Sequence, residues 1–287
     1  MTMKTIRFII AAAICLSLAA CKKDPLEGVT NYYPQIISFH EVRSSSATNI
    51  SGTINLEWDD NHRLTGEVVN AHYDAAPTIT MHSTITYTYD PDGKFVFRKR
   101  VYKSSTSEGS TVTYARMVLD KNGYVLKTEN TDQDGNLQQT LSTEQTISDG
   151  HVQKMVIAGC KEDLVWKQAE GFAEEYSWNK AGDLESVKQT GKNLFVEGGP
   201  LYTYTYSYDT SHDNPFCFDA LIEHPSYCDG IYQCKSVRTR HLCTGKTSEK
   251  EVRKYSYDFA DGKVTKLIIG FLGGAEDGYK TEYTFTY

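Results

Sequence analysis

The sequence contains few long runs of apolar residues. No long stretch has apolar residues spaced as on one face of a helix. One apolar run stands out, Phe8 to Leu18, and it is too short to favour a membrane-spanning helix. The mean hydropathy of -0.48 also argues against a helical membrane protein. The chain lacks a Gly-x-Ser-x-Gly elbow, a His-Glu-x-x-His helix and a phosphate loop. Neither a helical membrane protein nor an enzyme with a familiar catalytic signature is therefore indicated.

Positive charge is also in deficit. Lys and Arg number 30 against 37 Asp and Glu, which gives a formal net charge of -7. Residues 1–20 contain Lys4 and Arg7 and no acid, so removing them would bring the net charge to -9. This acidity disfavours nucleic acid and anionic lipid surfaces as partners.

What the chain does contain is one short pattern, repeated. Alternating aromatic or apolar residues lead into Asp or Asn, then a turn with Gly, then another apolar residue. Asp and Asn accept hydrogen bonds from turn amides, and Gly supplies the positive φ that a hairpin needs. The pattern therefore predicts serial β-hairpins. Clear copies lie at 87–95, 117–125, 176–184 and 255–264, with weaker copies at 58–64 and 132–137.

The segments between the turns have the period-two alternation of strands. Tyr202, Tyr204, Tyr206 and Tyr208 alternate with Thr and Ser, and residues 279–287 do the same. We expect an all-β protein with little helix, built as a large antiparallel β-meander of well over ten strands. Such a sheet should curve, split into a sandwich or form a porin-like, barrel-like wrap. Short helices are conceivable only at 162–175 and 216–223.

The N-terminal residues predict where the protein is located in the cell. Residues 1–20 have the basic start, apolar core and small-residue end of a signal peptide. Leu18-Ala19-Ala20-Cys21 resembles the lipobox of bacterial lipoproteins, which implies that Cys21 becomes the acylated first residue. Because Lys22 follows, the resemblance implies an outer-membrane anchor, either periplasmic-facing or at the cell surface. An ordinary secretory signal with an incidental Cys is the alternative.

The combination of features resembles a known family. Tyr-x-Tyr-Asp-x-x-Gly is similar to the YD repeats of Rhs-type proteins. With the lipobox and the terminal hairpin ending in Tyr287, the chain resembles gut-anaerobe outer-membrane lipoproteins of unknown function with a porin-like β fold. We expect a tether at 21–34 and a single β-meander domain at 35–287. The Cys-bearing insert at 210–245 departs from the pattern. The resemblance implies no catalytic residue and no cofactor.

Five cysteines remain once Cys15 leaves with the signal and Cys21 is acylated. In an oxidising compartment, two disulfides are expected within the insert, with a pairing that the sequence leaves open. Cys160 is expected to be a buried thiol rather than a nucleophile. Zinc bound with His212, His224 or His241 is a poorer fit, because the spacing lacks a Cys-x-x-Cys pair. We therefore expect no metal. The four disulfide candidates are Cys217, Cys228, Cys234 and Cys243.

Four aromatic residues in the insert are candidate ligand-binding residues: Phe216, Phe218, Tyr227 and Tyr232. Long loops in compact domains often carry function, and exposed aromatic rings can stack on sugars or contact a partner. The alternative is that these rings plug one end of the sheet as core. Asp132 to Asn136 superficially suits a calcium loop, but Thr143 stands where the loop needs Glu, so a turn is expected.

The sequence favours a non-enzymatic binding module, held at the membrane by the lipid on Cys21, for a glycan, a peptide or an envelope protein. A glycan-acting hydrolase using turn carboxylates is the alternative from another class. A membrane-spanning barrel or pore component is the third, since outer-membrane barrels also end on an alternating aromatic strand. Charges on both faces of strands such as 96–101 argue against it.

Overall fold

The structure is a computed structural model. It describes residues 28–43, 48–138, 142–158, 171–192, 199–216, 238–273 and 277–287. The lipobox and most of the Cys-bearing insert lie outside these ranges.

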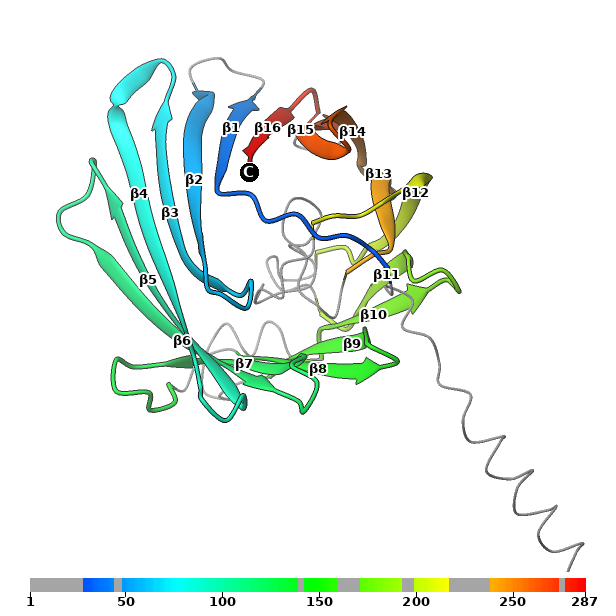
Figure 1. The fold of residues 1–287 in the computed structure, drawn as a ribbon, viewed down its shortest axis with the longest axis horizontal. Coiled ribbons are helices and arrows are strands. Elements are labelled where there is room, and N and C mark those ends of the chain that lie inside the picture. Colours follow the sequence, from blue (N-terminus) through cyan, green and yellow to red (C-terminus); the bar gives the residue numbers. More distant parts are fainter. Residues whose placement is uncertain are drawn as a thin grey trace, which may run out of the picture.

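The described chain folds into one closed antiparallel barrel of sixteen strands (Figure 1). Every strand pairs with its neighbours in sequence, and β1 pairs with β16 to close the ring. The all-β meander is thus confirmed, and the barrel-like wrap is the form it takes. The strands are β1 (Ile36–Val42), β2 (Ile50–Trp58), β3 (Leu64–Tyr73), β4 (Ala76–Tyr89), β5 (Phe95–Ser104), β6 (Thr111–Leu119), β7 (Val125–Thr131), β8 (Ser142–Ser148), β9 (His151–Ala158), β10 (Ala173–Trp178), β11 (Leu184–Thr190), β12 (Thr203–Asp213), β13 (His241–Thr247), β14 (Val252–Ala260), β15 (Lys263–Leu272) and β16 (Lys280–Thr286).

One helix expectation is wrong where the structure describes it. Residues 173–175, the end of the possible helix at 162–175, begin β10 and pair with β9 and β11. Phe172, Glu174 and Tyr176 are buried at every second position, while Glu175 and Ser177 between and after them are exposed. That spacing suits a strand with one covered face, and pairing on both sides decides between strand and helix. Residues 162–170 and 217–223 lie outside the described residues.

The repeated Asp or Asn closes each hairpin turn through its side chain. Asp120 Oδ1 accepts hydrogen bonds from the backbone amides of Asn122 and Tyr124, at 2.8 and 2.9 Å. Asn179 makes the same two contacts with the amides two and four residues later. Gly123 and Gly182 take a positive φ inside these turns. In the weaker copy at 58–64, His62 adopts this conformation instead, with φ of 58°.

The aromatic residue before the Asp or Asn has a separate function. Its side chain donates a hydrogen bond to a backbone carbonyl of a neighbouring segment; we call these contacts the rim hydrogen bonds. Several accepting carbonyls belong to the first residue after a turn, where a bulge shifts the strand pairing. The aromatic–Asp repeat thus joins each hairpin to the next. The donor and acceptor pairs are Trp58 with Pro34, Tyr89 with Leu64, Trp178 with Val152, Tyr208 with Leu184, Tyr257 with Cys243, and Tyr287 with Val264.

The up-and-down topology gives the barrel two different ends. Apart from the weaker copy at 132–137, the Asp/Asn turns lie at one end, which we call the turn end; it also holds the residues before β1 and the C-terminal Tyr287. The connections that follow β1, β3, β5 and the other odd-numbered strands lie at the opposite end, which we call the loop end.

The two faces of the barrel wall differ in chemistry. Ile37, Val96 and Met117 are fully buried, and Leu267 is 1% exposed. Strand register places the members of this buried set on one face, as in the row Ile37, Phe285 and Ile54. The chain that crosses the ring in Figure 1 contacts the same face, so this face points inward. The remaining alternate positions form the outward face.

Candidate functional site

At the turn end, the residues before β1 contact the residues that follow β12, the residues that precede β13, and the C-terminal residue. The backbone amide of Tyr32 donates to Pro215 O at 3.3 Å, and Arg238 Nη2 donates to Asn31 Oδ1 at 2.6 Å. Tyr32 packs edge-on against Tyr287, with ring centroids 5.8 Å apart. The described part of the expected tether therefore lies against the barrel rim rather than away from it.

Of the four aromatic candidates, the structure describes Phe216. Its side chain is 3% exposed, and its ring lies 4.9 Å from Phe285, measured between centroids. Asn214, also buried, accepts the Phe216 amide through Oδ1 and donates to Thr239 Oγ1. Phe216 thus packs as a core side chain. Phe218, Tyr227 and Tyr232 lie outside the described residues.

Among the cysteines, the structure describes Cys243 alone. It is partly buried in β13, and its Sγ donates a hydrogen bond to Gly245 O at 3.4 Å. The expected disulfides therefore remain predictions, because Cys217, Cys228 and Cys234 lie outside the described residues, as do Cys21 and Cys160. Within the described ranges, no three His, Cys, Asp or Glu side chains are grouped to hold a metal ion.

Two groups of polar side chains superficially suit hydrolysis. At the end of β12, Asp209, Ser211 and His212 contact one another, but Ser211 Oγ and Asp209 Oδ2 both approach the same ring nitrogen, His212 Nδ1. A nucleophile–base–acid relay needs the two imidazole nitrogens to serve different partners. The pKa of Asp209 falls to about 2 because Ser211 and His212 hydrogen-bond to its carboxylate. This group is an exposed irregularity of β12, where the pairing with β13 shifts.

The second group is buried. Asp183 is 1% exposed, and its two oxygens accept from the His241 backbone amide at 2.8 Å and from His241 Nδ1 at 2.7 Å. The contact joins the β10–β11 turn to β13, and the Arg240 amide adds a bond to Gly182 O. The pair therefore anchors the end of the insert to the barrel.

The inward face combines aromatic rings with charges. Lys246 is 5% exposed, and its Nζ lies 4.1 Å from the centroid of the Tyr204 ring. Glu174, 1% exposed, accepts hydrogen bonds from the Tyr176 hydroxyl at 2.6 Å and from Gln189 Nε2 at 3.2 Å. The inward face is thus mainly aromatic and apolar, and its few buried charges are held against rings and hydrogen-bonding side chains.

The outward face is polar on most strands, with an apolar group on β5 and β6, where Phe95 pairs with Val118 and Val101 pairs with Val112. On β4 its positions are Thr80, His82, Thr84, Thr86 and Thr88. The large apolar side chains exposed on this face include Ile36, Phe97, Val112 and Leu272. Charged side chains stand between them and make ion pairs across strands. Three such pairs are Lys127 with Glu144, Lys154 with Glu175, and Lys266 with Glu282.

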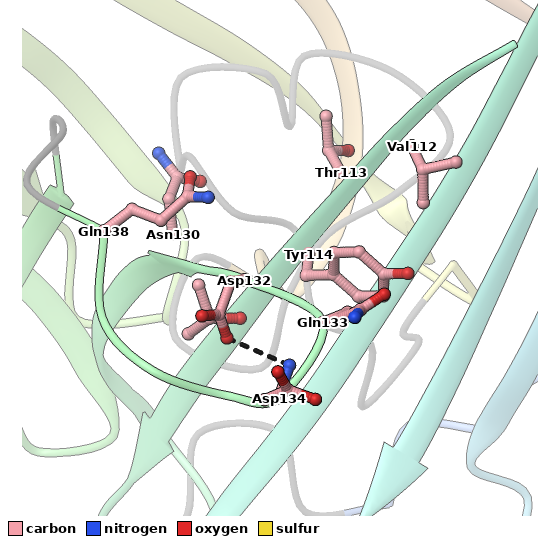
Figure 2. A pocket seen from close by; sticks show the side chains of 9 residues that line it. Val112, Thr113, Tyr114, Asn130, Asp132, Gln133, Asp134 and Gln138 are labelled. Atoms are coloured by element: carbon pink, nitrogen blue, oxygen red, sulfur yellow. Dashed lines mark hydrogen bonds between the residues drawn. The ribbon is translucent and has the colours of Figure 1, made fainter.

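A polar pocket lies at the loop end, between β6 and the connection from β7 to β8 (Figure 2). Its volume is about 510 Å³. Apart from Val112, its lining side chains carry hydroxyl, amide or carboxylate groups, and no Lys or Arg is among them. The lining residues are Val112, Thr113, Tyr114, Asn130, Thr131, Asp132, Gln133, Asp134 and Gln138.

The pocket loop is held in shape by Asp132. Its Oδ1 accepts the amides of Asp134 and Asn136, both at 2.9 Å, and its Oδ2 accepts Asn136 Nδ2 at 3.0 Å. These hydrogen bonds, led by those from Asn136, lower the pKa of Asp132. The expected turn is therefore present, and its carboxylate is engaged within the loop.

The sequence did not predict this pocket as a unit. It placed Asp132 in a turn correctly, but Tyr114 belongs to β6 and meets the loop only through strand pairing, as in the register of Tyr114 with Thr131. To predict that these residues lie together, one would have to know which connection lies at which end of the barrel.

No family model matches the chain, and no curated protein matches it. Among solved structures, a porin-like protein from Bacteroides uniformis is similar over 89% of this chain and 98% of its own, with 16% identity and a TM-score of 0.59. A β-barrel-like protein of a domain of unknown function from Brucella abortus matches over 90% of this chain and 98% of its own, with 11% identity and a TM-score of 0.32. The first likeness shows a porin-like β fold. Within the described ranges, no helix has the length and apolarity needed to cross a membrane.

Proposed function

We propose that this protein is a lipid-anchored envelope protein whose barrel stands in water and binds a ligand without transforming it. The polar, charged outward face is the observation that carries the proposal. A barrel in lipid needs an apolar outer band with aromatic girdles, and a polar interior. Here the aromatic and apolar side chains gather on the inward face instead.

The energetic cost of placing this wall in lipid is large. A Lys or Arg facing lipid at the bilayer midplane costs about 2–4 kcal/mol. Lys99, Lys154 and Lys188 each lie within the middle part of a strand on the outward face. Those three alone would cost about 6–12 kcal/mol, which is comparable to the whole stability of a typical domain.

The N-terminal anchor is compatible with such a barrel. The described chain reaches the barrel at the turn end, where Tyr33 stacks on His62 and packs against Trp58. From Cys21 to Asn31 an extended chain spans at most about 35 Å. A lipid on Cys21 would therefore hold the turn end near the membrane and leave the loop end free for ligands.

Binding is favoured over catalysis because the groups that most suit catalysis are engaged elsewhere. Asp183 and His241 join the β10–β11 turn to β13, and Asp209, Ser211 and His212 contact one another within the irregular end of β12. A water-facing barrel with a polar pocket and no assembled acid–base pair among its described residues suits recognition of an extracellular ligand.

The test uses the full-length chain with Cys21→Ser, and Cys15→Ser as the matched control within the signal peptide. We expect Cys21→Ser to move the protein from the membrane fraction to the soluble fraction, and Cys15→Ser to leave it with the membrane. Washing the wild-type membranes with alkaline carbonate separates lipid-anchored from loosely attached protein. If Cys21→Ser stays in the membrane after this wash, the barrel itself is embedded, and the spanning alternative replaces the proposal.

A further inference from the structure

We infer that the polar pocket between β6 and the β7–β8 connection binds a neutral sugar unit of an extracellular glycan. The inference rests on the proposed function and names its ligand class. The volume of about 510 Å³ falls in the range of small-ligand sites, about 300–1,000 Å³.

The lining chemistry excludes other ligand classes in turn. An anion would meet Asp132 and Asp134 with no Lys or Arg in the lining to balance its charge. An apolar ligand would leave most of the lining amides and hydroxyls without partners. A cation would meet the charges of Asp132 and Asp134, but the oxygens of Asp132 already accept three hydrogen bonds within its loop, which leaves Asp134 as the carboxylate open to direct contact.

A neutral sugar fits what remains. Each sugar hydroxyl both donates and accepts, and so does each of the amides of Asn130, Gln133 and Gln138. Tyr114 adds a ring with an apolar face and a polar tip. Lys99 Nζ lies over this ring at 6.0 Å from its centroid, which is the outer limit of a cation–π contact.

The pocket is also preformed. Thr131 bridges to Leu137, and the Gln138 amide donates to Asn130 O at 3.0 Å, which fixes both ends of the loop. With Asp132 holding the turn between them, little chain entropy remains to be lost when a ligand binds. The pocket lies at the loop end, opposite the end that the N-terminal chain reaches, and so faces away from the proposed anchor.

The experiment measures binding by the full-chain lipoprotein in detergent micelles. An array of neutral gluco-, manno-, galacto-, xylo- and N-acetylhexosamine oligosaccharides supplies the probes, and calorimetry gives the Kd of the best one. The test variant is Gln133→Ala with Gln138→Ala, two exposed side chains on the pocket loop. The matched control is Glu108→Ala with Ser110→Ala, two exposed side chains on the neighbouring β5–β6 connection.

We expect one or more neutral oligosaccharides to bind, and the test variant to weaken the Kd about tenfold or more, since each lost hydrogen bond weakens binding severalfold. Tyr114→Ala should weaken binding by a similar factor, while the control stays within about twofold of wild type. The urea midpoint of each variant checks that the barrel is intact.

Three results would overturn the inference. One is that no neutral sugar binds; another is that only a basic peptide or spermine binds. The third is that sugars bind equally well to wild type and to both pocket variants, in which case the binding function stands and the pocket assignment falls. The fractionation of Cys21→Ser reports on the proposed function separately, because it requires no ligand.

Discussion

The rim hydrogen bonds predict a specific cost for removing a single oxygen atom. Tyr89 of β4 donates to Leu64 O and Tyr208 of β12 donates to Leu184 O, both at 2.9 Å. Leu64 is 1% exposed and Leu184 is 7% exposed. Tyr→Phe at either position keeps the ring but leaves a carbonyl beside a buried residue without this donor.

The expected loss is about 1–2 kcal/mol for each substitution, between the net worth of a hydrogen bond and the penalty of an unsatisfied buried acceptor. Because β4 and β12 are not neighbours in the barrel, the double variant should lose the sum of the two single losses. Urea unfolding followed by tryptophan fluorescence measures the shift in midpoint at constant slope.

Tyr114→Phe is the matched control, because Tyr114 lies at the loop end and outside the rim hydrogen bonds. Its unfolding midpoint should stay within experimental error of the wild-type value. If Tyr89→Phe and Tyr208→Phe unfold at the same urea concentration as Tyr114→Phe, the repeat is not held by these bonds and the explanation for its aromatic position is wrong.

Two further predictions concern packing and pH. Gly52→Ala would place a Cβ 2.5 Å from Asn70 O, so thermal unfolding should show a loss of stability of about 1–3 kcal/mol. Gly270→Ala is the control and should be nearly neutral, because its Cβ would meet nothing within 4 Å. Equal losses of stability in the two variants would contradict the predicted clash. Hydrogen bonds from Lys266 and from a second lysine lower the pKa of Glu282 from 4.5 to about 2. Because this pKa is depressed in the folded state, the stabilisation is present above pH 4.5 and is lost as the pH falls toward 2. Glu282→Gln should therefore flatten the acid limb of the urea midpoint measured against pH, and an unchanged limb would refute the assignment.

The fold was largely predictable because its signals are local. The alternation of a strand and the Asp/Gly pattern of a turn both fit within ten residues of sequence. The copy at 176–184 forms the hairpin that its sequence predicts. Serial short turns then force neighbouring strands to pair in order. Closure of the ring was not predictable, because it depends on β1 meeting β16, and the register of Ile37 with Phe285 joins segments at opposite ends of the chain.

The site was less predictable for the same reason. Phe216 stood out as a candidate for being aromatic and outside the repeat, yet it packs on Phe285, a contact that only closure creates. Tyr114 and Gln138 were ordinary residues of a strand and a turn until the barrel placed them on one pocket. The sequence alone shows which residues alternate along a strand. It does not show which residues of different strands lie at the same end or on the same face of the barrel.

The central claim is that the outward face of the barrel contacts water, and Phe97 offers the most direct test. Phe97 lies on the outward face of β5 and is 38% exposed. Phe97→Trp in the full-length lipoprotein, reconstituted in vesicles, places a fluorophore at this position, and subtracting the wild-type signal isolates it. The account predicts quenching by aqueous acrylamide and none by brominated lipid chains. Quenching by the brominated lipid, with protection from acrylamide, would show a wall immersed in the bilayer and would contradict the account.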